Sequence, residues 1–154
     1  MAVSAPMLED IRRPRWPERP FDVARAYLHY GAVADELRLW FDPEPTGWFS
    51  DLIDAPEGDD VAVMVGMDSE YQSTDEVVGI HVYPLLAGAA RHRPHWRRLA
   101  EPGPPLEAVA SFVSEVRDLF ERYWTPAPPI DEQLARLGRS DKAALDAPTA
   151  DPTP

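Results

Sequence analysis

Two apolar segments joined by a polar connection constrain the fold of this chain more than any other feature. Val61 to Met67 is continuously apolar and rich in β-branched residues, as is typical of a strand covered on both faces. Val77 to Tyr83 is again strand-like. The connection Asp68 to Glu76 is shorter than the dozen or more residues of a parallel crossover. The two segments are therefore predicted to form an antiparallel hairpin with a long polar loop.

Two further strands are predicted before this hairpin. Glu36 to Phe41 alternates apolar and polar residues, which is the period of a half-buried strand. Trp48 to Ile53 is a second, less regular candidate, and a proline-rich acidic turn separates the two. Four strands in succession over residues 36–83 indicate an antiparallel meander with at least one face that needs cover.

The predicted cover is helical. Residues 105–124 place apolar side chains at intervals of three and four, and Pro105 suits the first helical position. Phe21 to Tyr30 shows a shorter helical pattern. We therefore expect an α+β domain over residues 21–125: a mainly antiparallel four-stranded sheet packed against one long C-terminal helix and a short N-terminal helix.

Proline usage separates this domain from its ends. Many of the 18 prolines lie outside the predicted sheet, so residues 1–20 are expected to form an extended Pro/Arg-rich arm and residues 126–154 a Pro/Ala-rich, largely disordered tail. No apolar run is long enough to span a membrane or to act as a signal peptide, which predicts a cytoplasmic protein. Arginine supplies all of the basic residues except Lys142, a usage typical of a GC-rich bacterial genome.

The charge of the chain is strongly negative and unevenly spread. The net charge is −12, and residues 31–90 hold thirteen acids against Arg38 alone. Such a surface repels phosphate backbones, so nucleic acid is a disfavoured partner, whereas a basic protein would be attracted. The alternative is that the acids, which lie where loops are expected, only keep the protein soluble. Residues 91–98 are the exception, with four arginines and no acid.

Residues 30–83 follow a recognisable order of features: a tyrosine, an acidic turn, a strand, an aspartate-rich turn and a valine-rich strand, carried by Tyr30, Asp35, Leu37, Leu39, Val61 to Val65, Asp68, Glu70 and Val77 to Val82. This order resembles a small uncharacterised bacterial β-meander family, many of whose members are known only as a domain of unknown function and some of which lie beside toxin genes. The resemblance implies a meander and an antitoxin-like or immunity-like role. His81 stands where that family usually has glutamate.

Several kinds of chemistry are excluded or disfavoured. The chain has no cysteine, no Gly-x-Gly phosphate loop and no Gly-x-Ser-x-Gly nucleophile elbow. The acidic loop 68–76 fails the EF-hand pattern, because Ser73 occupies its sixth position and Gly79 its twelfth. His92 and His95 lie among arginines, whose charge opposes binding of a cation. We expect neither a metal site nor a cofactor.

His81 is the strongest candidate for catalysis that the sequence offers. On a strand it shares a face with Gly79 and Tyr83, and the loop carboxylates Asp68 and Glu70 belong to the same hairpin. A histidine flanked by carboxylates can act as a general base, so a small enzyme or ligand-binding protein using these residues is one hypothesis. The alternative is a histidine that is only held in place by hydrogen bonds.

The preferred hypothesis is a non-enzymatic module that binds another protein through its charged loops or sheet edge. The candidate contact residues combine aromatic rings with charge: Trp40, Trp48, Asp59, Asp60, Arg93, Trp96 and Arg97. The arginines of residues 91–98 would face an anion or an acidic surface. The alternative is that they pair with the protein's own acidic loops.

Overall fold

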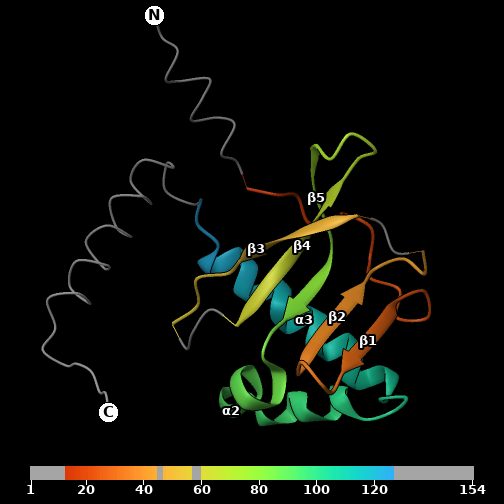
Figure 1. Cartoon of the computed structure of the whole chain (residues 1–154), viewed down its shortest axis with the longest axis vertical. Helices are drawn as coiled ribbons and strands as arrows, with labels where there is room; N and C mark the ends of the chain where they lie inside the picture. The colour runs from red at the N-terminus through yellow and green to blue at the C-terminus, as the bar shows by residue number, and fades with distance from the viewer. Residues whose placement is uncertain (1–12, 45–46, 57–59, 127–154) are drawn as a thin grey trace, which may run out of the picture.

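A computed structural model describes residues 13–44, 47–56 and 60–126 of the chain. The described part is an α+β fold in which an open antiparallel sheet of five strands packs against a long helix (Figure 1). The predicted segment 126–154, apart from its first residue, lies outside the described residues, as do residues 1–12 of the predicted arm. The predicted fold class is thus confirmed, but the prediction of four strands is wrong.

The sheet has the order β1-β2-β5-β4-β3, and every neighbouring pair is antiparallel. The strands are β1 (Tyr27–Gly31), β2 (Glu36–Trp40), β3 (Trp48–Leu52), β4 (Val61–Met67) and β5 (Ser73–Val82). The predicted hairpin is the pair of β4 and β5, with Val63 opposite Ile80. Val61 to Gly66 are all buried, as expected of a strand covered on both faces.

The predicted meander over residues 36–83 is wrong in one pairing. β3, β4 and β5 follow one another as a meander, but β2 lies beside β5 rather than beside β3. β5 is ten residues long and pairs with β4 on one side and β2 on the other. β2 therefore pairs with a strand that lies far along the chain, beyond both β3 and β4, which no local pattern reports.

The predicted helix over Phe21 to Tyr30 is also wrong, because its second half is strand β1. The Asp22 carboxylate accepts a hydrogen bond from the Ala24 backbone N–H at 3.0 Å, but this caps a single turn and not a helix. From Tyr27 the side chains alternate between more exposed and more buried positions. A short helix is marginal on its own, whereas pairing with β2 gives every residue of β1 a partner.

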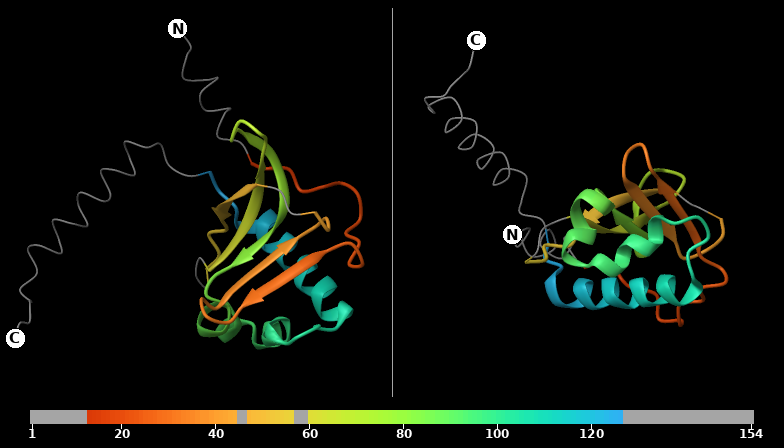
Figure 2. Two further views of the ribbon diagram at one scale, coloured as in Figure 1. Left: turned by 45° about the vertical axis from the view of Figure 1, so that its right-hand side comes forward. Right: turned by 90° about the horizontal axis from the view of Figure 1, so that it is seen from below.

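The helix α3 (Leu106–Tyr123) confirms the predicted C-terminal helix. Pro105 is its N-cap residue rather than its first helical residue. The apolar stripe of α3 is buried against one face of the sheet, with Phe112 and Phe120 both 1% exposed (Figure 2). Three short helical segments that were not predicted follow β5 and lie at the lower end of the sheet in Figure 1: a π-helical turn η1 (Leu85–Ala89), α2 (Ala90–His92) and a 3₁₀ segment η2 (Pro94–Ala100).

Asp35 joins the β1–β2 turn to the start of η1. Its carboxylate accepts hydrogen bonds from the backbone N–H groups of Leu86 and Ala87 and from the Tyr30 hydroxyl, at 2.8, 2.9 and 2.7 Å. Burial acts to raise the pKa of Asp35, but these hydrogen bonds outweigh it and lower the pKa. The bond to Asp35, with burial, raises the pKa of Tyr30 to about 12. A carboxylate from a distant turn thus caps a helical segment that lacks a cap of its own.

The described part of the predicted arm is extended but docked. The Arg15 N–H donates to the Asp75 carbonyl at 2.8 Å, and the Val77 N–H donates to the Arg15 carbonyl at 2.9 Å. The Trp16 ring then packs between Phe41 and Phe120, at 5.3 and 5.7 Å between ring centres. The arm therefore closes one edge of the core between α3 and the sheet.

Gly79→Ala is expected to destabilise the fold by roughly 3 kcal/mol, because overpacking at a rigid site has a high energetic cost. A β-carbon at Gly79 would lie 2.1 Å from the Leu39 carbonyl oxygen and 2.8 Å from the Met64 sulfur, so β2 and β5 would have to separate. Gly31→Ala in β1 is the matched control, since its β-carbon would meet only ordinary contacts from 3.6 Å outward. Urea unfolding of the two variants measures the difference, and equal midpoints would contradict the close approach.

Candidate functional site

The face of the sheet opposite α3 carries polar and aromatic side chains. In Figure 1 α3 lies behind the sheet, so this face, which we call the open face, points toward the viewer. Strand alternation and register place on it Glu36, Arg38 and Trp40 from β2, Gly79 and His81 from β5, Met64 and Ala62 from β4, and Trp48 and Ser50 from β3. Four strands thus contribute side chains to one surface. Two neighbours among them, β2 and β5, lie far apart in the sequence.

His81 lies at the centre of the open face and is hydrogen-bonded through both ring nitrogens. Its Nε2 lies 2.6 Å from Glu36 Oε2, and its Nδ1 lies 2.8 Å from Ser50 Oγ. Because an ionised carboxylate only accepts hydrogen bonds, Nε2 is the donor to Glu36. In the neutral ring Nδ1 then accepts the hydrogen bond from the Ser50 hydroxyl. His81 thus has the hydrogen-bond partners that a general base needs, but they are Glu36 and Ser50 and not the predicted Asp68, Glu70 and Tyr83.

The other residues predicted to act with His81 lie elsewhere. Asp68 sits in the β4–β5 loop, where its carboxylate accepts hydrogen bonds from the backbone N–H groups of Glu70 and Gln72 at 2.8 and 3.0 Å. Ser73 opens β5 beside this loop, and His81 lies near the other end of the strand, after roughly 26 Å of extended chain. Tyr83 follows β5 and is exposed. The structure therefore does not bring Asp68, Glu70 and His81 together.

An aromatic row crosses the open face beside His81. Successive ring centres are 5.5 Å apart from Tyr27 to Trp40, 6.4 Å from Trp40 to Trp48 and 5.2 Å from Trp48 to His81. Trp40 is only 8% exposed, and its indole N–H has no hydrogen-bond partner in the described part of the chain. Of the two tryptophans predicted as contact residues, Trp40 is thus largely buried, whereas Trp48 is half-buried and partly accessible.

The arginine cluster of residues 91–98 contacts α3. Arg93 lies 3.7 Å from the Glu115 carboxylate, His95 lies 2.7 Å from it, and Arg98 lies 3.9 Å from Glu107. Trp96 is 1% exposed, donates its indole N–H to Glu115 at 3.1 Å and stacks edge-on against Phe112. Arg93, His95 and Arg98 therefore pair with acids of the protein itself, but these acids lie on α3 and not in the acidic loops that the alternative named.

The remaining predicted contact residues are dispersed. Arg97 is exposed on η2. Asp60 is half-buried before β4, and its carbonyl accepts the Tyr83 N–H at 2.9 Å. Asp59 lies outside the described residues. No single surface of the described chain collects the whole predicted set.

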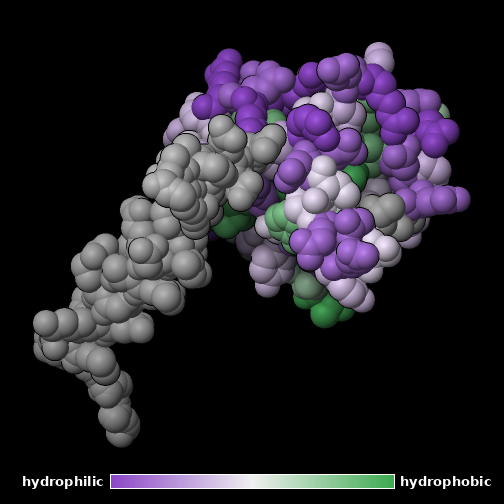
Figure 3. Space-filling view, turned by 90° about the horizontal axis from the view of Figure 1, so that it is seen from above, coloured by the Kyte–Doolittle hydropathy of each residue, from purple (hydrophilic) through white to green (hydrophobic). Residues whose placement is uncertain are grey.

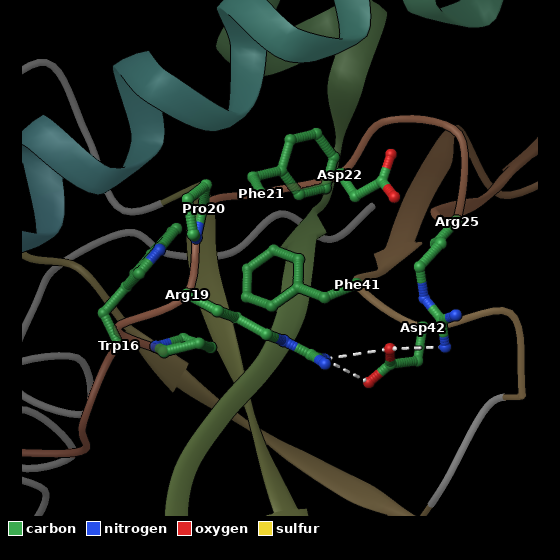
Figure 4. Close-up of a pocket in the computed structure, with 9 residues that line it drawn as sticks. Trp16, Arg19, Pro20, Phe21, Asp22, Arg25, Phe41 and Asp42 are labelled. Atoms are coloured by element: carbon green, nitrogen blue, oxygen red, sulfur yellow. Dashed lines mark hydrogen bonds and ion pairs between the residues drawn. The ribbon is translucent and has the colours of Figure 1, made fainter.

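A cavity that the sequence does not predict lies beneath the N-terminal arm. A cavity of about 240 Å³ is lined by Trp16, Phe21 and Phe41, with an ion-pair cluster at its rim (Figure 4). In this cluster the Arg19 guanidinium reaches both Asp42 carboxylate oxygens at 2.9 Å, and Arg25 reaches one of them at 3.4 Å. The only signal in the sequence was Trp16 in the proline-rich arm and Phe21 directly after the arm.

Asp51→Asn is expected to raise the melting temperature near neutral pH. Asp51 pairs with the core residue Val63, and burial raises the pKa of its carboxyl. A raised folded-state pKa means that the ionised form destabilises the fold. The advantage of the variant should therefore shrink as the pH falls through the raised pKa toward about 3.9, the value for an unfolded aspartate.

Thermal melts between about pH 4 and pH 8 measure this effect from the ordinary pKa of aspartate to above neutral pH. The exposed Asp54→Asn is the control, because it removes the same charge close by in the sequence. A stabilisation that grows as the pH falls would contradict the assignment.

Comparison with known proteins gives this site no precedent. Within the described ranges no cluster of three or more acidic or histidine side chains is arranged to hold a metal ion, and no helix there has the length and apolar character needed to cross a membrane. No family model matches the chain, and no curated protein or solved structure matches it either.

Proposed function

We propose that this protein is a protein-binding module that engages a basic partner through the connection between β4 and β5. Residues 68–76, which comprise this loop and the start of β5, are here called the acidic hairpin. It projects from one end of the sheet (Figure 1), and all of its residues are exposed. Tyr71 at its tip is 82% exposed. A large aromatic side chain held out beside carboxylates is the observation that carries the proposal.

The acidic hairpin is ordered by its own hydrogen bonds. The Asp68 carboxylate closes the first turn, the Ser73 hydroxyl donates to the Asp75 carboxylate at 3.1 Å, and the Thr74 hydroxyl donates to the Gly66 carbonyl at 3.1 Å. The arm holds its base through Arg15. A loop that is already ordered loses less conformational entropy on binding.

The charge of the acidic hairpin is largely uncompensated within the described part of the chain. Among Asp68, Glu70, Asp75 and Glu76, only Glu76 has an ion pair with another described residue, Arg15, at 3.4 Å between two well-exposed side chains. Seen from the hairpin side, most of the described surface is hydrophilic (Figure 3). With a net charge of −12, such a surface attracts basic proteins and accelerates their association. It equally disfavours nucleic acid.

The biological setting that we propose is an antitoxin-like or immunity-like role in a bacterium. It rests on the resemblance of residues 30–83 to a β-meander family, some of whose members lie beside toxin genes. A rigid acidic projection suits the task of covering a basic surface on such a partner. The proposal requires neither catalysis nor a cofactor.

The variant D68N/E70Q/D75N is expected to lose the partner while keeping the fold. The amide introduced by D68N keeps an oxygen that accepts the two turn hydrogen bonds, and D75N introduces a residue type that tolerates the left-handed backbone of Asp75, whose φ is 59°. The tagged full chain is used as bait in an extract of its native host, and captured proteins are quantified at low and high salt. Proteins held by the acidic hairpin should be lost at high salt and from this variant.

The matched control is E44Q/D54N/E101Q, which removes three exposed acids away from the acidic hairpin. It produces the same change in net charge, so it separates the hairpin from the overall field of the protein. Equal capture by the two triple variants, or no protein captured by the unmodified chain, would refute the proposed function.

A further inference from the structure

We propose that Ser50, His81 and Glu36 form a catalytic triad that hydrolyses esters of small carboxylic acids. In this assignment Ser50 is the nucleophile, His81 the general base and Glu36 the positioning residue. The site lies on the open face, away from the acidic hairpin, and the inference does not depend on the proposed protein partner.

The three residues meet because of the register of the strands that carry them. His81 on β5 lies opposite Ala62 on β4, and Ser50 on β3 lies opposite Met64 on β4, so the two side chains flank β4 on a diagonal. β3 and β5 are separated by β4, or by roughly 10 Å. The small side chain of Ala62 leaves the imidazole room to reach across β4 to Ser50, at 2.8 Å. Glu36 approaches the ring from β2 on the other side, at 2.6 Å.

The hydrogen-bond directions are those that nucleophilic catalysis requires. Glu36 accepts from Nε2–H and thereby leaves the lone pair of Nδ1 directed at the Ser50 hydroxyl. The His81 side chain is 17% exposed and the Glu36 side chain 27%, so both are shielded, whereas Ser50 is exposed to an incoming substrate. Arg38, whose guanidinium lies 3.5 Å from Glu36, is the other charged group at this network, and it pairs with the same carboxylate.

Hydrolysis of the ester through an acyl-Ser50 intermediate needs only the ester and water. Ser50 Oγ bonds to the ester carbonyl carbon as its proton passes to His81 Nδ1, which gives a tetrahedral oxyanion. The carbon–oxygen bond to the leaving alcohol then breaks, and the alcohol takes the proton from His81. Water next attacks the acyl-Ser50 ester, gives a proton to His81 and releases the carboxylic acid, and Ser50 regains its proton.

The edge of the sheet supplies hydrogen-bond donors for the oxyanion. The Ile53 N–H donates to Val61 and the Met67 N–H to Gly47, so the odd-numbered residues of β3 bond to β4. The N–H groups of Ser50 and Leu52 therefore point away from β4, toward the outer edge of the sheet. On the same face as Ser50 stand Trp48 and Leu52, the latter 53% exposed. Their apolar surfaces suit a short acyl chain or an aromatic leaving group.

The test uses the purified full chain with p-nitrophenyl acetate and with an alkyl fluorophosphonate, which phosphonylates activated serines and releases fluoride. We expect hydrolysis above the buffer rate, a loss of at least about 100-fold in Ser50→Ala, and a phosphonyl adduct mapped to Ser50. Ser111→Ala, which changes another exposed serine on α3, should leave the rate unchanged. Ser50→Cys keeps a nucleophile at the same position and should still form an acyl-enzyme.

Three results would overturn the assignment: no hydrolysis above the buffer rate, hydrolysis that survives in Ser50→Ala, or an adduct at a different residue. Survival in Ser50→Ala would mean that an imidazole alone attacks the ester. For Glu36, we expect Glu36→Gln to lower kcat with little change in KM, because an amide can donate to Nε2 as well as accept from it and so no longer fixes the tautomer in which Nδ1 accepts from Ser50. A loss of melting temperature with no split between kcat and KM would instead show that Glu36 only supports the fold.

Discussion

The double pairing of β5 is the interaction on which the rest of the structure depends. β5 bonds to β4 on one side and to β2 on the other, and its residues Ile80 and Val82 are fully buried against the helical layer. This central position is possible only because Gly79 lets the β2 backbone approach closely. Burial of the resulting apolar face requires α3 above it, and the edge left between α3 and the sheet is closed by Trp16 from the arm. Both α3 and the arm therefore cover the apolar face that forms when β5 pairs with β2 and β4.

The spacing of apolar residues in the sequence predicted the elements with long, regular patterns. The apolar run of β4 and the stripe of α3 are long and regular, and both were predicted to within a residue or two. β1 is too short for a helical and an extended pattern to be told apart, and its conformation is decided by its pairing with β2. Trp96 stands among arginines in the sequence, but its burial depends on α3, which begins further along the chain. Such non-local contacts leave no spacing to detect.

The same reasoning explains why His81 could be identified as a candidate while its partners could not. Glu36 precedes His81 by 45 residues and Ser50 precedes it by 31, and the three converge only through the strand order β2-β5-β4-β3. In the meander predicted from sequence, β2 would have lain beside β3 and far from β5, so Glu36 would not have reached the ring. The absence of a Gly-x-Ser-x-Gly elbow excludes one scaffold for a nucleophilic serine. It does not exclude a serine placed by a sheet edge, because a triad is defined by geometry and not by position in the chain.

The composition of β3 bears on the role of Ser50, since an edge strand must avoid pairing with other chains. Polar residues at Ser50 and Asp51 interrupt an otherwise apolar strand, which protects an exposed edge from aggregation. Protection of the edge from aggregation, however, does not require a particular polar side chain or a particular face of the strand. Asp51 faces the core side, where burial opposes its ionisation, whereas Ser50 faces His81 with its hydroxyl within hydrogen-bond distance of Nδ1. Asp51 alone would be enough to discourage edge pairing. Protection of the edge therefore does not explain why a hydroxyl stands at Ser50. It also does not explain why this hydroxyl lies against the His81 ring, which the Glu36 carboxylate already orients.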